Sequence, residues 1–132
     1  GEVELEPTAR ETLRTHLVAA HCGHSLASLT AYMLRAQFLK DRIMAHELRS
    51  QSGTGRGVLI AGNGHIRKDY GVPQHLDGTV SLAFVEVRPG TREVSEYDIS
   101  PYDYVYFTPV VDPVDACERF RKSLEKMSSP KK

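Results

Sequence analysis

The feature that most constrains the fold is a short apolar run that leads directly into a polar, glycine-containing loop. Residues 58–61 (Val-Leu-Ile-Ala) lie between two glycines, and residues 62–65 read Gly-Asn-Gly-His. An unbroken apolar run of this length is typical of a strand buried on both faces in a sheet that helices cover. The loop would then lie at the carboxyl end of that strand, where open α/β sheets bind their ligands. The pattern therefore predicts an α/β fold with a site at this edge.

Two helices are expected before this strand. The first should cover about residues 7–21, because Pro7 suits a first turn and Thr8 has capping-box spacing to Glu11. The second should cover residues 26–50, with an apolar stripe facing the core. The residues expected on that stripe are Leu26, Leu29, Met33, Ala36, Ile43 and Met44.

The rest of the chain predicts a small, mainly parallel sheet covered by helices. The further elements expected are a short helix within residues 72–76, strands at residues 79–87 and 104–108, and a last helix over about residues 114–124. Three strands are few, so the chain should be part of a larger sheet that further residues or a second copy complete. We expect one α/β domain over residues 1–127 and a disordered, solvated tail over residues 128–132.

Length and charge exclude several classes of protein. With 132 residues, the chain can bury one core without a metal or disulfide to hold it together. Lys and Arg together number 17, as do Asp and Glu, so no charge excess favours nucleic acid as a partner. No apolar run approaches the roughly 18 residues that a membrane helix needs. We therefore expect neither nucleic-acid binding nor a membrane span in this chain.

The two cysteines leave two interpretations open. Cys22 and Cys117 are far apart, and the Cys-x-x-Cys spacing of zinc ribbons and redox pairs is absent. They could form a disulfide that closes a loop of roughly 95 residues, provided that the compartment is oxidising. They could equally be two unrelated buried thiols.

His65 is the best-placed candidate for chemistry. Histidine is a common metal ligand and titrates near neutral pH. Gly62 and Gly64 beside it permit tight turns and the close approach of a ligand. The alternative is a hydrogen-bonded structural histidine, which is the more usual role of a lone loop histidine.

Charged and phenolic side chains follow His65 closely. Arg67 or Lys68 could hold a carboxylate or a propionate, and Arg does so through two parallel hydrogen bonds. Tyr70 adds a phenol that could bind ferric iron as a phenolate. The alternative is a run of solvated charges.

Two further places are weaker candidates. His21 and His24 flank Cys22 in a possible metal clip, although the turn between helices could point the two imidazoles apart. Glu86 is the one carboxylate inside an apolar strand. It would be a candidate for acid–base work only if its side of the strand were buried.

These motifs together resemble the ChaN-like family of haem-binding, iron-regulated lipoproteins, part of a wider group with Tiki-type proteases, TraB-like proteins and erythromycin esterases. The resemblance covers about residues 16–120, as its carboxy-terminal half, and Lys40 stands where arginine is expected. The residues that carry it are His21-Cys22, Ala36-Gln37, Asp41, Met44-Ala45, the run from Val58 to His65, Gly71-Val72-Pro73, the strand from Tyr104 to Thr108-Pro109, and Cys117.

The resemblance implies a haem-binding protein of the bacterial envelope that takes up or handles haem or iron. It implies haem as cofactor and a pocket completed by a second subunit or by an amino-terminal half. The full-length protein would be periplasmic or anchored to the outer membrane. The residues implied in binding are His65, Tyr70, Arg67, Gly62, Gly64 and His21. The alternative is a metal-assisted or histidine-based hydrolase that uses His65 and Glu86, so enzymatic activity stays open, with binding preferred.

Overall fold

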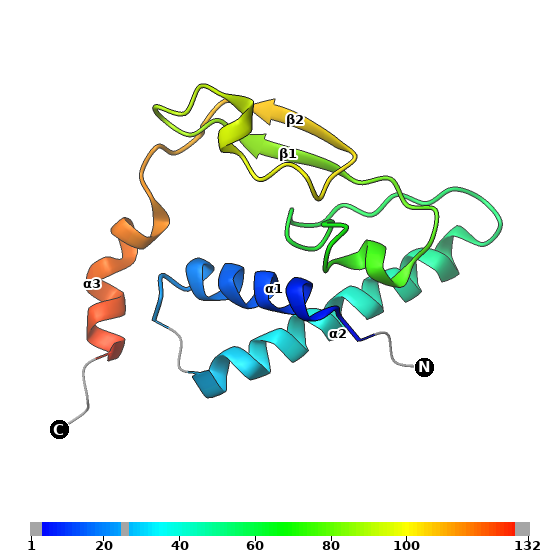
Figure 1. The fold of residues 1–132 in the computed structure, drawn as a ribbon, viewed down its shortest axis with the longest axis horizontal. Coiled ribbons are helices and arrows are strands. Elements are labelled where there is room, and N and C mark those ends of the chain that lie inside the picture. Colours follow the sequence, from blue (N-terminus) through cyan, green and yellow to red (C-terminus); the bar gives the residue numbers. More distant parts are fainter. Residues whose placement is uncertain (1–3, 25–26, 129–132) are drawn as a thin grey trace.

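The computed structural model describes residues 4–24 and 27–128, and it confirms the α/β class (Figure 1). Helices and strands follow one another as α1 (Pro7–Ala20), α2 (Ala27–Ser52), the 3₁₀ helix η1 (Val72–His75), β1 (Leu82–Glu86), the 3₁₀ helix η2 (Val94–Glu96), β2 (Tyr104–Thr108) and α3 (Ala116–Ser128). The predicted tail lies outside the described residues except for Ser128, which ends α3.

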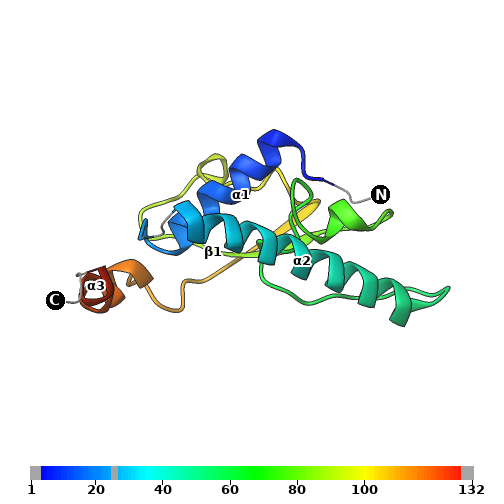
Figure 2. The same ribbon diagram turned by 90° about the horizontal axis from the view of Figure 1, so that it is seen from below.

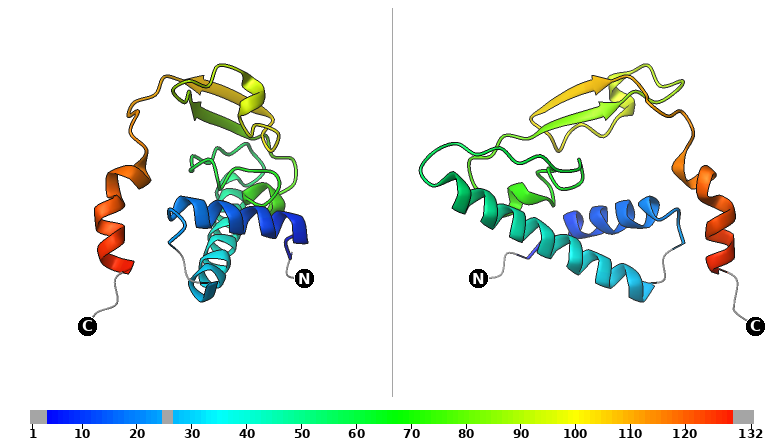
Figure 3. Two further views of the ribbon diagram at one scale, coloured as in Figure 1. Left: turned by 60° about the vertical axis from the view of Figure 1, so that its left-hand side comes forward. Right: turned by 180° about the vertical axis from the view of Figure 1, so that it is seen from behind.

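The elements form a helical layer and a strand layer. α1 packs beside α2, and the two strands lie above them with the loop segment between α2 and β1 in the space between (Figures 1 and 3). β1 and β2 pair in parallel, in a register from Leu82 with Tyr104 to Glu86 with Thr108. The parallel arrangement agrees with the sequence prediction, but the helices cover only one side of the sheet.

The predicted strand at residues 58–61 is wrong. The segment is extended but pairs with no strand among the described residues, and Val58 and Ile60 are 87% and 94% exposed. A strand exists only when its backbone groups find a neighbour, and β1 bonds to β2 alone in the described part of the chain. The side-chain nitrogen of Asn63 instead donates to the carbonyl of Phe84 on β1, at 2.7 Å.

The first helix begins where proline predicts but without the expected cap. Pro7 lies in the first turn, and no side chain caps the helix. Arg14 donates two hydrogen bonds to the Glu11 carboxylate instead, so the predicted Thr8–Glu11 capping box is wrong. An ion pair one turn along the helix competes for the same carboxylate.

The predicted apolar stripe of α2 is only partly buried. Leu29 and Ile43 are 48% and 52% exposed, whereas the buried residues of the helix include Thr30, Asp41 and Ala45. Leu26 lies outside the described residues. The described core is small: Leu5, Leu13 and Tyr70 pack with Ala9, Leu17, Leu34 and Phe38. The buried face of α2 is thus partly polar, which hydrophobic spacing alone does not reveal.

α3 is held to the rest of the molecule mainly by a covalent bond. Cys22 and Cys117 form a disulfide, which decides between the two interpretations of the cysteines. Within the described residues α3 packs against no other helix or strand, and it lies apart from them in every view (Figures 1–3). None of the described helices is long and apolar enough to cross a membrane.

Candidate functional site

The loop that carries His65 is built by its own backbone. The amide of His65 donates to Gly62 O at 2.8 Å, and the amide of Val72 donates to His65 O at 2.7 Å. Ser81, just before β1, donates its hydroxyl to Ile66 O at 2.5 Å. These bonds fix the loop between the end of α2 and the start of the sheet, so His65 is presented on ordered backbone.

The glycines of the loop differ in what they do. A Cβ at Gly71 would lie 2.3 Å from His65 O, so only glycine fits there. A Cβ at Gly62 would meet nothing within 4 Å, and one at Gly64 would make an ordinary contact 3.9 Å from the Tyr70 hydroxyl. Gly71 is therefore the glycine that the loop geometry requires, and the predicted roles of Gly62 and Gly64 in ligand approach stay predictions.

The His65 ring meets two side chains of α2 at a single atom. Nδ1 lies 2.6 Å from Asp41 Oδ1 and 2.8 Å from Gln37 Nε2. The His65 side chain is 25% exposed. Since both contacts involve Nδ1, Nε2 remains for a further partner. Metal-binding and catalytic histidines commonly have a carboxylate at one ring nitrogen, while the second nitrogen binds the metal or the substrate.

Asp41 is fully buried, at 0% exposure. Burial raises its pKa to about 6, although the hydrogen bond with His65 acts in the opposite direction. Its second oxygen, Oδ2, has no hydrogen-bond partner among the described residues. A buried carboxylate with an unpartnered oxygen destabilises the fold, so its presence calls for an explanation beyond packing.

Tyr70 belongs to the core rather than to the exposed part of the loop. It is 2% exposed, and its hydroxyl lies 2.9 Å from Nδ1 of His16 on α1. Burial raises the pKa of this phenol to about 12. The structure therefore keeps Tyr70 neutral and hydrogen-bonded. His16 was not identified from the sequence, because nothing in a helical stripe marks a partner 54 residues away.

Arg67 is held by acidic side chains of this chain. It is 6% exposed, bonds Asp69 through two nitrogens at 2.9 and 2.7 Å, and bonds Asp98 at 2.7 Å. Its guanidinium also lies over the rings of Tyr70 and Tyr102. Burial alone would lower the pKa of the guanidinium, but its carboxylate partners raise it above its ordinary value.

Lys68 is more accessible. Its Nζ lies 2.5 Å from Asp103, and 48% of its side chain is exposed. An exposed ion pair contributes at most about 1 kcal/mol, so this cation can exchange partners at small cost. Of the two cations that the sequence singled out, Lys68 is the one that a ligand can reach.

Comparison with known proteins assigns the chain to a family. The sequence model of the family described as "Haem-binding uptake, Tiki superfamily, ChaN" matches residues 2–76, more than half of the 132 residues. The chain belongs to this family. Searches of curated proteins and of solved structures each found no match. The matched range contains α1, α2 and the whole His65 loop, so the haem-binding uptake family is recognised through the elements that build this site.

The other site residues predicted from the sequence are not part of a cluster like the one around His65. His21 has its Nδ1 2.8 Å from Leu17 O of its own helix, and Cys22 is in the disulfide, so it offers no thiolate. Among the described residues, no three His, Cys, Asp or Glu side chains gather around a possible metal position, with His24 included in that search. Glu86 is exposed, so the burial that would have made it a candidate is missing.

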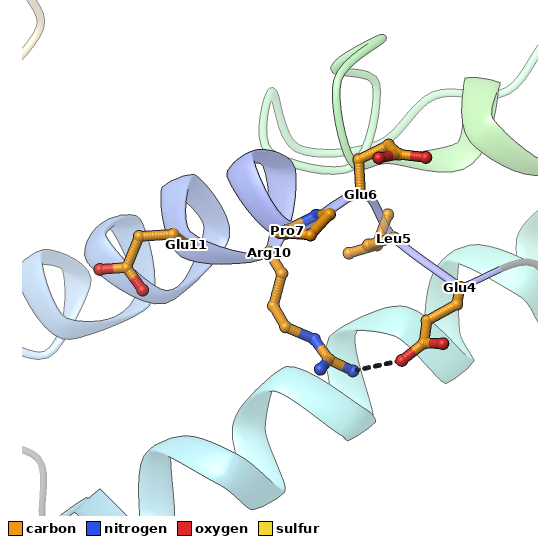
Figure 4. A pocket seen from close by; sticks show the side chains of 6 residues that line it. All are labelled: Glu4, Leu5, Glu6, Pro7, Arg10 and Glu11. Atoms are coloured by element: carbon orange, nitrogen blue, oxygen red, sulfur yellow. Dashed lines mark hydrogen bonds and ion pairs between the residues drawn. The ribbon is translucent and has the colours of Figure 1, made fainter.

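Two hollows lie near these elements. A groove of about 790 Å³ separates the extended segment 57–61 from residues 79–84, with Arg49 and Arg56 also among its lining residues. A smaller hollow of about 400 Å³ lies at the start of α1, where Arg10 reaches Glu4 (Figure 4). Neither hollow is lined by His65.

Proposed function

We propose that this chain binds haem through His65 and takes part in haem uptake or handling in the bacterial envelope. The observation that carries the proposal is the His65 ring, whose Nδ1 is 2.6 Å from a fully buried carboxylate while Nε2 faces away from that contact. Membership of a haem-binding uptake family supports haem as the ligand.

The donor set fits an iron porphyrin. Neutral imidazole is a common axial ligand of haem iron, and a carboxylate at the opposite ring nitrogen strengthens it as a donor. Asp41 supplies that carboxylate, and its second oxygen has no other described partner. Haem, when bound, would supply an iron centre that accepts an axial nitrogen or oxygen ligand. His65 would hold it, and Asp41 would orient His65.

The contacts of the two cations rank them as propionate partners. Lys68 is half exposed and makes one surface ion pair, so its ammonium can turn to a propionate. Arg67 is itself buried and would first have to break its ion pairs with two carboxylates, Asp69 and Asp98. We therefore assign the propionate contact to Lys68 and a supporting role in the loop to Arg67.

Tyr70 is the second candidate ligand, and its surroundings disfavour it in this arrangement. A phenolate would have to form in a buried site where the pKa is raised to about 12, and the hydroxyl would have to leave His16. We propose instead that Tyr70 supports the loop, because its hydroxyl lies near Gly64 and its ring lies under the guanidinium of Arg67.

We further propose that a second copy of the chain, or an amino-terminal half, completes the pocket and that the full-length protein is periplasmic or anchored to the outer membrane. The exposure of Val58 and Ile60 and the two-stranded sheet support the need for further structure. The disulfide between Cys22 and Cys117 supports an oxidising compartment.

A haem titration tests the proposal. Adding haem to the purified chain should give a shifted Soret band that saturates at one equivalent per chain, or at half an equivalent if two chains share one haem. Electron paramagnetic resonance of the ferric complex should show a histidine-ligated species that His65→Ala lacks. A wild-type protein that gives only the spectrum of free haem would refute haem binding.

The same contact favours one other function. An Asp–His pair can activate water as a general base, so a hydrolase that uses His65 is the second candidate. Hydrolysis of a p-nitrophenyl ester, measured without haem, separates the two. Turnover that His65→Ala and Asp41→Asn both abolish would support the hydrolase, and turnover equal to that of buffer would exclude it for such esters.

A further inference from the structure

We propose that Asp41 is a positioning residue that selects the ring tautomer of His65, and that Gln37 acts against it. The inference rests on the proposed function only in that Nε2 of His65 is taken as the atom offered to iron. Asp41 itself would touch neither haem nor substrate.

Asp41 and Gln37 approach the same ring atom. They lie four residues apart on α2, so both side chains project from one face of the helix. Nδ1 of His65 is 2.6 Å from Asp41 Oδ1 and 2.8 Å from Gln37 Nε2. One ring nitrogen carries either a proton or a lone pair. It can therefore donate to the carboxylate or accept from the amide, but it cannot do both at once.

The two arrangements present opposite forms of Nε2. When Nδ1–H donates to Asp41, the neutral ring has a lone pair at Nε2 and can bind a metal. When Nδ1 accepts a hydrogen bond from Gln37, the proton is at Nε2, and the ring cannot bind through that atom. Hydrogen bonds to a charged acceptor are roughly twice as strong as neutral ones, so Asp41 should prevail.

The destabilisation that results from burying the Asp41 carboxylate supports the same role. Its side chain is 0% exposed, and Oδ2 has no partner among the described residues. An apolar residue of similar size would avoid burying a charge. The contact that Asp41 makes from this buried position is the hydrogen bond that its Oδ1 accepts from His65 Nδ1. We therefore assign the carboxylate to control of that ring.

The direct test is the tautomer of His65 in the protein without haem. Long-range ¹⁵N–¹H correlation spectra, recorded over a pH series until the ring signals no longer change on the alkaline side, should show the Nδ1–H form of the neutral ring in the wild type. Asp41→Leu leaves Gln37 as the partner and should convert the ring to the Nε2–H form. Gln37→Leu should keep the Nδ1–H form. A ring that stays Nδ1–H in Asp41→Leu would overturn the proposal.

Haem affinity provides the second arm of the test. Loss of a carboxylate behind a metal-binding histidine typically weakens binding 10- to 100-fold, so Asp41→Leu should raise Kd by about that factor. Gln37→Leu, the matched change one turn away, should leave Kd unchanged or lower it. An equal loss in both variants would show that the helix face, rather than the carboxylate, matters, and would refute the assignment.

The two arms also separate the two proposals. If the wild-type chain does not bind haem, the proposed function fails, and the ¹⁵N spectra still decide the role of Asp41. If circular dichroism shows that Asp41→Leu is not folded, Asp41→Asn replaces it in the test. This variant keeps the side-chain volume and has an amide oxygen as a weaker hydrogen-bond acceptor. It should then show an Nδ1–H fraction below that of the wild type, and an unchanged fraction would contradict the proposal.

Discussion

Asp41→Asn should make the protein more stable at neutral pH while weakening its ligand site. Burial raises the pKa of Asp41 from 3.8 to about 6. In the pH range between these values the folded state keeps a proton that the unfolded state has lost. The unfolding free energy therefore falls as pH rises from about 4 to 6, and it stays lower above 6. At 1.36 kcal/mol per pKa unit the loss is about 3 kcal/mol.

Asparagine removes the charge but keeps the shape, so the variant should recover most of this energy. Urea unfolding followed by far-ultraviolet circular dichroism at pH 4 and pH 7.5 measures the difference. The variant should match the wild type at pH 4 and exceed it by about 2 to 3 kcal/mol at pH 7.5. Asp77→Asn, at an exposed position, is the control for loss of a surface carboxylate and should change the unfolding free energy by no more than about 0.5 kcal/mol. A variant less stable than the wild type at pH 7.5 would refute the reasoning.

Three further predictions concern the frame of the site. Gly71→Ala should destabilise the protein by about 2 kcal/mol and perturb the His65 loop, because the added Cβ would clash with backbone atoms. Gly62→Ala is the control and should leave the unfolding free energy in urea unchanged. Arg67→Gln should cost about 1 to 2 kcal/mol in the same urea titration, because it removes charge-assisted hydrogen bonds to Asp69 and Asp98, whose carboxylates stay partly hydrated. Reducing the bond between Cys22 and Cys117 should lower stability by about 4 kcal/mol and expose α3 to limited proteolysis first; unchanged cleavage sites would contradict this.

Local signals explain what the sequence predicted well. Pro7 marked the start of α1, and the β-branched and aromatic runs marked β1 and β2. These signals depend on neighbours within a few residues. The segment at 58–61 has an equally clear local signal, but no strand pairs with it in the described part of the chain, and pairing is a property of the whole sheet.

The site was predicted only in part for the same reason. His65 was placed by its position after an apolar run, but its partners Gln37 and Asp41 lie on α2, 28 and 24 residues away. A buried carboxylate breaks the hydrophobic period that identifies a buried face, so the stripe read from spacing missed the side of α2 that matters. The signal that could have suggested Gln37 and Asp41 is that two polar residues lie four positions apart on one helix and a loop histidine follows later in the chain.

The partners of the loop cations were equally distant. Arg67 was expected to face a ligand, yet Asp98, 31 residues later, bonds it together with Asp69. A charge run looks solvated when only its own neighbours are considered. Which cation is accessible depends on how the segment between β1 and β2 folds back, and no local pattern in the loop encodes that.

The haem dissociation constant of His65→Ala, set against that of His46→Ala, tests the central claim most directly. His46 is an exposed histidine on α2, so its loss controls for the removal of an imidazole. With Soret absorbance as the readout, His65→Ala should bind haem at least 10-fold more weakly than the wild type, and His46→Ala should bind as the wild type does. Equal affinity in all three proteins would contradict the assignment of His65 as the haem ligand.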